Sequence, residues 1–344
     1  MSQSLHSILH LYLGKNTPIM KKEGSAFVSS NIALCKYWGK RDNYLNLPIN
    51  NSLSISLGHL GTYTHITAIN SNEDHITLNG KVMSPDSIFF KRTIKFCNLF
   101  RQFEKVKFLI ETSNNIPTKA GLASSASGFA ALTLALFRLY SIPEKSEILS
   151  RVARLGSGSA CRSFYQGFSE WIRGIEKNGI DSFAIQFNND WHDLRIGLLK
   201  IIKTEKKVGS SEAMDLTRQN SPFFTEWTKQ ATKDLINIKQ AIIDQDFVKF
   251  GEISENNALK MHATMIASNP TILYWQEKTI TDMKRIWQAR EESIPVYFTL
   301  DAGPNLKLLF TKNTEYLIKK KFPEIMIINP LDNYKWNTTK ITNF

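Results

Sequence analysis

The stretch "PTKAGLASSASGFAAL", residues 117–132, bears most directly on the fold. It places small residues, among them Gly121, Ser124 and Ser125, at the start of an apolar helix expected over residues 122–139. Unpaired N–H groups and the helix dipole favour an anion there, and small side chains let a phosphate approach closely. A capped helix whose small residues serve packing explains the stretch equally well. The GxxxxGK[ST] pattern is absent, so it is not a Walker loop.

Composition limits the remaining classes. A chain of 344 residues suggests about two domains, and 42% hydrophobic with 22% charged residues is typical of a soluble globular protein. No apolar run approaches the ~20 residues that a membrane helix needs, and the N-terminus does not resemble a signal peptide. Three widely spaced cysteines without a CxxC pair favour a reducing cytoplasm over a disulfide framework or a zinc site.

The net charge of +12 raises the question of nucleic-acid binding. Lys and Arg are scattered along the chain, and no nucleic-acid-binding motif accompanies them. We therefore expect no nucleic-acid partner, and we expect the positive charge to favour polyphosphate ligands.

Hydrophobic periodicity predicts a mixed α+β chain in two lobes. In the first half we expect strands over 31–37, 52–57, 62–69 and 106–111 and helices over 88–103, 122–139 and 146–155. In the second half we expect a strand over 194–202, helices over 223–244, 246–265 and 270–290, and short strands near 296 and 306. The predicted division is an extension at 1–24, an N-terminal domain at 25–195 and a C-terminal domain at 196–344.

Three further motifs carry candidate chemistry. In "RLGSGSACRSF", residues 154–164, a guanidinium stands in a small-residue turn, where it could hold a carboxylate or phosphate or lie on the surface. In "NIALCKYWGKRD", residues 31–42, Lys36, Lys40 and Arg41 could meet a diphosphate or extend to solvent from a half-buried strand. In "TLDAGPN", residues 299–305, Asp301 taken alone is typical of a turn former.

Taken in order, these stretches resemble the diphosphomevalonate decarboxylase family of the GHMP kinase superfamily. "GLASSASG" alone is typical of any GHMP kinase, whereas "KYWGKRD" with "GSGSACRS" and "DAGPN" is specific to the decarboxylases. The likeness covers residues 25–312. It implies a two-lobed GHMP kinase fold of the α+β class, with an N-terminal lobe like domain 2 of ribosomal protein S5 and a ferredoxin-like, helical C-terminal lobe.

The resemblance also implies the activity. In this family ATP, with Mg²⁺, phosphorylates the 3-hydroxyl of mevalonate 5-diphosphate; phosphate and carbon dioxide then leave, and isopentenyl diphosphate forms for isoprenoid biosynthesis. A homodimer in the cytoplasm is implied as well.

The resemblance assigns roles to individual residues. Asp301 would stand beside the 3-hydroxyl, Lys40 would stabilise charge there and keep the aspartate ionised, and Arg162 would clamp the substrate carboxylate with Asn31 as a neighbour. The substrate would also contact Tyr37, Trp38, Gly39, Ser157, Gly158, Ser159, Ala160 and Cys161. The ATP phosphates would contact Gly121, Leu122, Ala123, Ser124 and Ser125.

Some positions depart from the family pattern. His75 stands where we expect the arginine that contacts the diphosphate, and Lys119 replaces a small residue. Asn220 replaces a threonine of the substrate site, with the hydroxyl of Ser221 next to it. Because of His75, two alternatives stay open: a relative that decarboxylates the monophosphate, and a mevalonate 3-kinase that does not decarboxylate.

Overall fold

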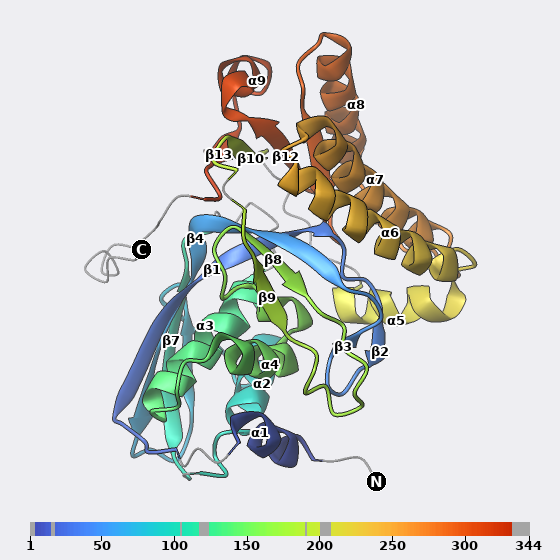
Figure 1. Ribbon diagram of the computed structural model, residues 1–344. Coiled ribbons are helices and arrows are strands. Elements are labelled where there is room, and N and C mark those ends of the chain that lie inside the picture. The colour runs from blue at the N-terminus through green and yellow to red at the C-terminus, as the bar shows by residue number, and fades with distance from the viewer. Residues whose placement is uncertain are drawn as a thin grey trace.

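The computed structural model describes residues 4–14, 18–103, 105–116, 124–189, 191–199 and 208–331. Its N-terminal lobe is built on a mixed sheet with the strand order β6-β5-β7-β4-β8-β9, and β1 pairs with β4 (Figure 1). The strands are β1 (Glu23–Cys35), β4 (Ser52–Ile69), β5 (His75–Leu78), β6 (Lys81–Val82), β7 (Lys107–Asn114), β8 (Phe168–Trp171) and β9 (Ala184–Phe187). A short hairpin, β2 (Lys40–Asp42) with β3 (Leu47–Pro48), projects from the end of β1.

Strand β4 is the centre of this sheet. It pairs antiparallel with β1 over most of its length, with β7 along its second half and with β8 at its start. The sequence predicted two strands here, but the chain continues through Gly58, which adopts a φ of +57°, and Gly61. A Cβ on Gly61 would lie 2.2 Å from the carbonyl oxygen of Val28, so glycine lets β1 approach.

A layer of helices covers one face of the sheet (Figure 1). It consists of α1 (Leu5–Leu13), α2 (Ile88–Cys97), α3 (Ser124–Leu139), α4 (Ser146–Gly156) and the short 3₁₀ helix η1 (Gly158–Arg162). The apolar faces of α1, α2, α3 and α4 share one core cluster with the sheet, and this cluster includes Phe96, Phe100 and Phe137. Helix α2 ends at Cys97, six residues before its predicted end, and α1 was not predicted at all.

The C-terminal lobe contains an antiparallel sheet in the order β11-β12-β10-β13 and several long helices. Its elements are β10 (Leu194–Leu198), α5 (Ser210–Asn220), α6 (Phe224–Ile243), α7 (Phe247–Ile266), α8 (Glu277–Glu291), β11 (Tyr297–Leu300), β12 (Leu306–Thr311), η2 (Lys312–Thr314), α9 (Glu315–Lys321) and β13 (Met326–Ile328). The predicted boundary at 195/196 falls inside β10, which pairs with β12 and β13 and so belongs to this lobe.

The two lobes share an apolar core. One buried cluster joins Ile32 and Ile55 of the first sheet to Leu194 and Leu309 of the second and to Phe250 of α7. This packing fixes the end of β1 against α7, and Thr299 of β11 donates a hydrogen bond to the Ala33 carbonyl of β1, where the candidate site lies. The mixed α+β fold predicted from the sequence is therefore confirmed.

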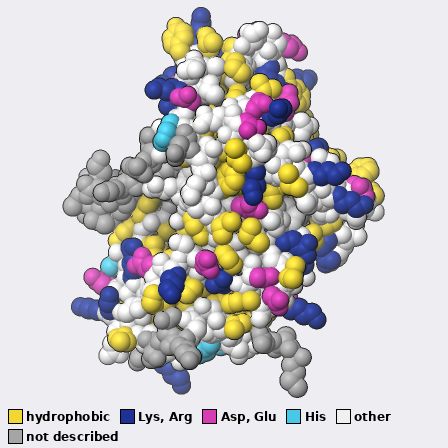
Figure 2. Space-filling view, in the orientation of Figure 1, with side chains coloured by type: hydrophobic (Ala, Val, Ile, Leu, Met, Phe, Trp, Pro, Cys, Tyr) yellow, Lys and Arg dark blue, Asp and Glu magenta, His cyan; other side chains and the backbone are white. Residues whose placement is uncertain are grey.

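The surface agrees with the scattered charge of the sequence. On the face seen in Figure 2, Lys and Arg side chains are interspersed with Asp and Glu. In the described part of the chain, we find no helix with the length and apolar character needed to cross a membrane.

Candidate active site

A cavity of about 850 Å³ lies where the two lobes meet. Its wall comes from the end of β1, the β2–β3 hairpin, α2, α3, the loop before η1, the start of α5 and the turn after β11. The predicted site residues that line it are Asn31, Tyr37, Trp38, Lys40, Ser125, Ser157, Gly158, Ser159, Arg162 and Asp301. Residues far apart in the sequence are thus brought to one site.

Asp301 stands between two buried lysines. Its Oδ1 lies 2.9 Å from Nζ of Lys36 and its Oδ2 lies 3.2 Å from Nζ of Lys307. Burial by itself raises the pKa of the Asp301 carboxyl, but the charges and hydrogen bonds of the two lysines outweigh it and lower the pKa far below its usual range. The Asp301 side chain keeps 33% of its surface accessible, facing the cavity. It is therefore an ionised hydrogen-bond acceptor open to a ligand.

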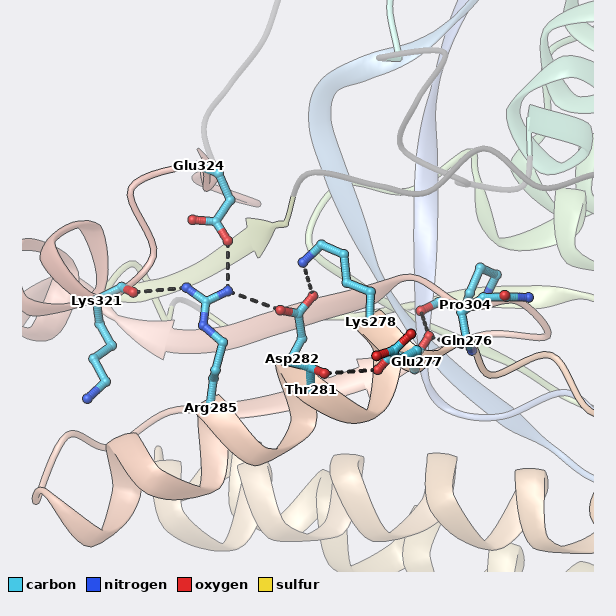
Figure 3. A network of polar contacts seen from close by, with 10 residues as sticks. Gln276, Glu277, Lys278, Thr281, Asp282, Arg285, Pro304, Lys321 and Glu324 are labelled. Atoms are coloured by element: carbon cyan, nitrogen blue, oxygen red, sulfur yellow. Dashed lines mark hydrogen bonds and ion pairs between the residues drawn. The ribbon is translucent and has the colours of Figure 1, made fainter.

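The turn that carries Asp301 is supported from α7 and α8. Nε2 of His262, on α7, lies 3.0 Å from the Asp301 carbonyl oxygen, which requires Nε2 to carry the proton. Thr279 Oγ1, on α8, donates to the carbonyl of Pro304 at 2.7 Å. Figure 3 shows Pro304 and, further along the helix, the ion pairs of Asp282 and Arg285. His262, expected only to pack on a helix face, is thus a positioning residue.

Lys40 does not pair with Asp301, contrary to the sequence prediction. It lines the cavity, but its Nζ donates to Ser211 Oγ at 2.6 Å, and Lys36 and Lys307 pair with the carboxylate instead. The reason is the turn at Gly39, whose φ of +105° directs the chain into the hairpin. A Cβ there would also lie 2.5 Å from the ring of Phe224. Lys36 and Lys40 therefore serve different parts of the cavity.

Arg162 is buried at the back of the cavity. Its guanidinium donates to Ser52 Oγ and lies 5.7 Å from the centroid of the Trp171 ring. Its Nε makes no hydrogen bond to any described residue. Nearby, Asn31 Nδ2 donates to Ser163 Oγ at 2.7 Å, which fixes the amide. A buried cation with an unused donor is suited to an anionic ligand group.

The loop before η1 meets Tyr37 closely. A Cβ on Gly158 would lie 2.7 Å from the Tyr37 hydroxyl, so glycine is required for this contact. That hydroxyl is buried and makes no hydrogen bond within the described residues. Ser157 and Ser159 line the cavity on either side, whereas Ala160 and Cys161, predicted to contact the substrate, lie fully buried outside its lining. They support the loop through packing, as Gly39 supports the hairpin.

The cavity contains an arginine that the sequence analysis missed. Arg92 of α2 lines it, lies 5.2 Å from the Phe129 ring centroid and places NH2 3.4 Å from the carbonyl of Gly156. His75, expected in that role, is exposed on β5 and is not part of the cavity lining. The signal for Arg92 was the polar helix face that it shares with Lys95, one turn further along.

Helix α5 contributes its first turn, not its last. Ser210 and Ser211 line the cavity at the start of the helix. Asn220 and Ser221, predicted to contact the substrate, lie at the opposite end and outside the lining. Eleven helical residues separate the two ends by about 16 Å, which is why the two pairs cannot exchange roles.

The phosphate-loop prediction can be followed in part. Gly121, Leu122 and Ala123 lie outside the described residues, as does Lys119, and of Ser124 the backbone alone is described. Ser125, in the first turn of α3, lines the cavity. Behind it, the hydroxyl of Ser127 lies 2.8 Å from that of Thr62 on β4, which fixes the start of α3 against the sheet.

Comparisons with known proteins agree with this arrangement. Residues 28–184 match the family model of the diphosphomevalonate decarboxylase-like N-terminal domain, and residues 198–338 match that of the mevalonate 5-diphosphate decarboxylase C-terminal domain. The chain belongs to the diphosphomevalonate decarboxylase family. The diphosphomevalonate decarboxylase of Debaryomyces hansenii is 34% identical over 92% of this chain and 87% of its own length. That of Saccharomyces cerevisiae is 37% identical over 83% of this chain and 77% of its own.

Solved structures of the family superpose on most of this chain. The mevalonate diphosphate decarboxylase of Staphylococcus aureus has a TM-score of 0.84 at 37% identity, covering 90% of this chain and 95% of that one. A structure of MDDEF in complex with MVAPP, AMPPCP and magnesium has a TM-score of 0.83 at 37% identity, covering 89% and 96%. These two proteins thus share this fold over nearly their full length.

The buried histidine yields a prediction for stability. Burial lowers the pKa of His262 from 6.5 to about 3, so between these values the unfolded chain takes up a proton that the folded chain refuses. The free energy of unfolding contributed by this residue should therefore fall as pH drops, by up to about 1.4 kcal/mol per pH unit. Urea unfolding of the wild type and of His262→Gln, from pH 7 to 4.5, measures the free energy of unfolding of each. The wild type should be the more stable at pH 7, and the difference should shrink as the pH falls. A difference that stays constant with pH would contradict it.

Proposed function

We propose that this chain catalyses the ATP-dependent decarboxylation of mevalonate 5-diphosphate to isopentenyl diphosphate, with release of ADP, phosphate and carbon dioxide. The observation that carries the proposal is the cavity at the lobe interface. It combines an ionised carboxylate, Asp301, with a buried guanidinium, Arg162, and with further cations, among them Arg92. Such a site can hold a ligand that has a hydroxyl, a carboxylate and a diphosphate. Family membership supports the same assignment.

In the proposed reaction Asp301 accepts a hydrogen bond from the 3-hydroxyl of the substrate. Because Lys36 and Lys307 hold the pKa of the Asp301 carboxyl so low, it is a weak proton acceptor, and its main role is to orient the hydroxyl toward the γ-phosphate of ATP. The two ammonium groups also stabilise negative charge that develops as the phosphoryl group is transferred.

Arg162 would hold the substrate carboxylate. After phosphorylation, the bond between C3 and its oxygen breaks and phosphate leaves with the electron pair. The C1–C2 bond then breaks, carbon dioxide departs, and the electrons of that bond form the C2–C3 double bond of the product. A guanidinium buried against Trp171 is held in one position, so it can keep the carboxylate aligned during this step.

The other end of the cavity would bind the two polyphosphates. Burial lowers the pKa of both Lys40 and Arg92, and the charge of Arg92 lowers that of Lys40 further. With Ser157, Ser159 and Ser211 they would hold the substrate diphosphate. ATP would lie at the start of α3, with Ser125 as one contact. Magnesium would be held mainly by nucleotide phosphates and water and would neutralise the charge on the phosphates.

The remaining expectations are also proposals. We place the domain division between Phe187 and Leu194, since β9 belongs to one sheet and β10 to the other. A cytoplasmic location fits the buried free thiols of Cys35, Cys97 and Cys161. A homodimer follows from the resemblance, and gel filtration at micromolar concentration tests it: elution at the size of a monomer would contradict it.

The position of His75 weighs against the two alternative functions. A monophosphate decarboxylase or a mevalonate 3-kinase was considered because His75 replaced an expected arginine, but His75 lies outside the cavity lining and Arg92 lies within it. Nothing among the described residues of the cavity favours a ligand with one phosphate.

The proposed function predicts the products of a simple assay. Wild-type protein with ATP, magnesium and mevalonate 5-diphosphate should release carbon dioxide and ADP in equal amounts, and mevalonate 5-phosphate should give far less of both. Asp301→Asn should lower kcat by a factor on the order of 10²–10⁴, because an amide orients the hydroxyl less well and carries no charge. ADP without carbon dioxide in the wild type would contradict the proposal.

A pair of variants tests the assignment of the diphosphate cation. Arg92→Gln should raise KM for mevalonate 5-diphosphate about 10- to 100-fold, the loss expected for a charge-assisted hydrogen bond. His75→Gln, at an exposed position on β5, should leave KM within about twofold of the wild type. Steady-state kinetics at saturating ATP gives both values, and a large effect at His75 with none at Arg92 would reverse the assignment.

A further inference from the structure

Helix α1 lies outside the two ranges of the chain that match the family models. The N-terminal family model begins at residue 28, whereas α1 spans Leu5–Leu13. The helix is nevertheless well built: Ser4 Oγ caps it by accepting from the backbone N–H of Ser7. Its inner face is buried in the core of the N-terminal lobe through Ile8, Leu9, Tyr12 and Leu13. Burial of this kind makes α1 an integral part of the lobe.

The first turn of α1 reaches the cavity. Leu5 lines it together with Tyr44, Lys95 and Leu99. The backbone N–H of Leu5 donates to the Tyr44 hydroxyl at 3.1 Å, and Tyr44 belongs to the turn of the hairpin that carries Lys40. On the other side, His6 Nε2 lies 3.2 Å from the Asn98 carbonyl oxygen at the end of α2. The helix therefore bridges the two elements that supply Lys40 and Arg92.

The last turn of α1 contacts helix α4, whose end leads into the Gly156–Ser159 loop. Arg154, near the end of α4, is fully buried, and its guanidinium donates to the Tyr12 hydroxyl and to the Gly179 carbonyl, the latter at 3.0 Å. The Tyr12 hydroxyl in turn donates to the Asn178 carbonyl at 2.6 Å. Tyr12 thus links α1 to the end of α4 and to the loop before β9.

The hairpin holds the same end of α4 from the opposite side. Asn46 Nδ2 donates to the carbonyls of Arg154 and Leu155, at 2.9 and 3.2 Å. The chain then enters the small-residue loop that lines the cavity. A glycine- and serine-rich loop has little rigidity of its own, so its position depends on how firmly its preceding helix end is held.

We propose that α1 is part of the substrate site, with Tyr12 as a positioning residue for the Gly156–Ser159 loop and Leu5 as the outer wall of the cationic end of the cavity. This inference rests on the proposed function, because the ligand at that end is the diphosphate of mevalonate 5-diphosphate. The apolar side chain of Leu5 keeps water from the phosphate, which strengthens the attraction of Lys40 and Arg92 for it.

Tyr12→Phe tests the positioning role. Phenylalanine keeps the ring, whose centroid lies 5.6 Å from Arg154 Cζ, and removes the hydroxyl that accepts from the guanidinium. We expect KM for mevalonate 5-diphosphate to rise about tenfold, with kcat and KM for ATP within about twofold of the wild type. If the hydroxyl had only a structural role, the melting temperature would fall, but KM for mevalonate 5-diphosphate would not rise selectively.

Ile8→Val is the matched control for Tyr12→Phe. It weakens the packing of the same helix, but Ile8 lines neither the cavity nor the Arg154 site. Its KM for mevalonate 5-diphosphate should equal that of the wild type, even if its melting temperature falls as far as that of Tyr12→Phe. Equal KM values for the two variants would overturn the positioning role.

Substitutions at Leu5 test the wall independently of Tyr12. Leu5→Glu places a carboxylate beside the expected diphosphate and should raise KM for mevalonate 5-diphosphate about tenfold at low salt, with a smaller effect at high salt. Leu5→Gln introduces a side chain of the same shape as Glu without its charge, so it should raise KM less. Leu11→Glu controls for the change in net charge, since Leu11 is exposed on the outer face of α1. The same KM for Leu5→Glu and Leu5→Gln would refute the wall.

Two results separate this inference from the proposed function. Calorimetric titration of mevalonate 5-diphosphate into the wild type and each variant gives dissociation constants that do not depend on turnover. A wild type that neither binds nor turns over this compound would refute the proposed function and, with it, the role of α1. An active wild type whose variants bind as tightly as it does would refute the role of α1 alone.

Discussion

The ion pairs of Asp301 with Lys36 and Lys307 are the constraint on which the site depends. Lys36 follows β1 of the first lobe, while Asp301 and Lys307 belong to the second, so the pair of Asp301 with Lys36 forms only when the lobes are packed. Both lysines are almost fully buried, and an unpaired buried charge is very costly. The surrounding hydrogen bonds, such as that from the Lys36 backbone N–H to Asn257 Oδ1, keep the three groups in register.

The cavity concentrates positive charge, which lowers the stability of the free protein but favours the binding of anionic ligands. Arg162, Lys40 and Arg92 face the same space, and burial lowers the pKa of each. Cations held close together repel one another, and this repulsion is relieved when a polyanion binds. The site therefore trades stability of the free protein for affinity toward phosphorylated ligands.

Much of the fold could be predicted from local patterns. Helices α6 and α7 lie within one residue of their predicted bounds, because both have long, regular apolar faces. Errors arose where tertiary contacts override a local pattern. The two strands predicted at 52–57 and 62–69 are one strand, since pairing with β1 carries the chain across the glycines. Helix α8 begins at Glu277, seven residues after its predicted start at Pro270.

By itself the sequence determined the family, the fold class and the residue types of the site, because these follow from motifs that are continuous along the chain. The tertiary structure decided which charges meet. A positive φ at Gly39 directs Lys40 away from Asp301, and the packing of α2 against α4 and Phe129 decides that Arg92, not His75, enters the cavity. Side-chain direction after a turn, and the buried face of a helix, depend on contacts distant in sequence, which no short motif contains.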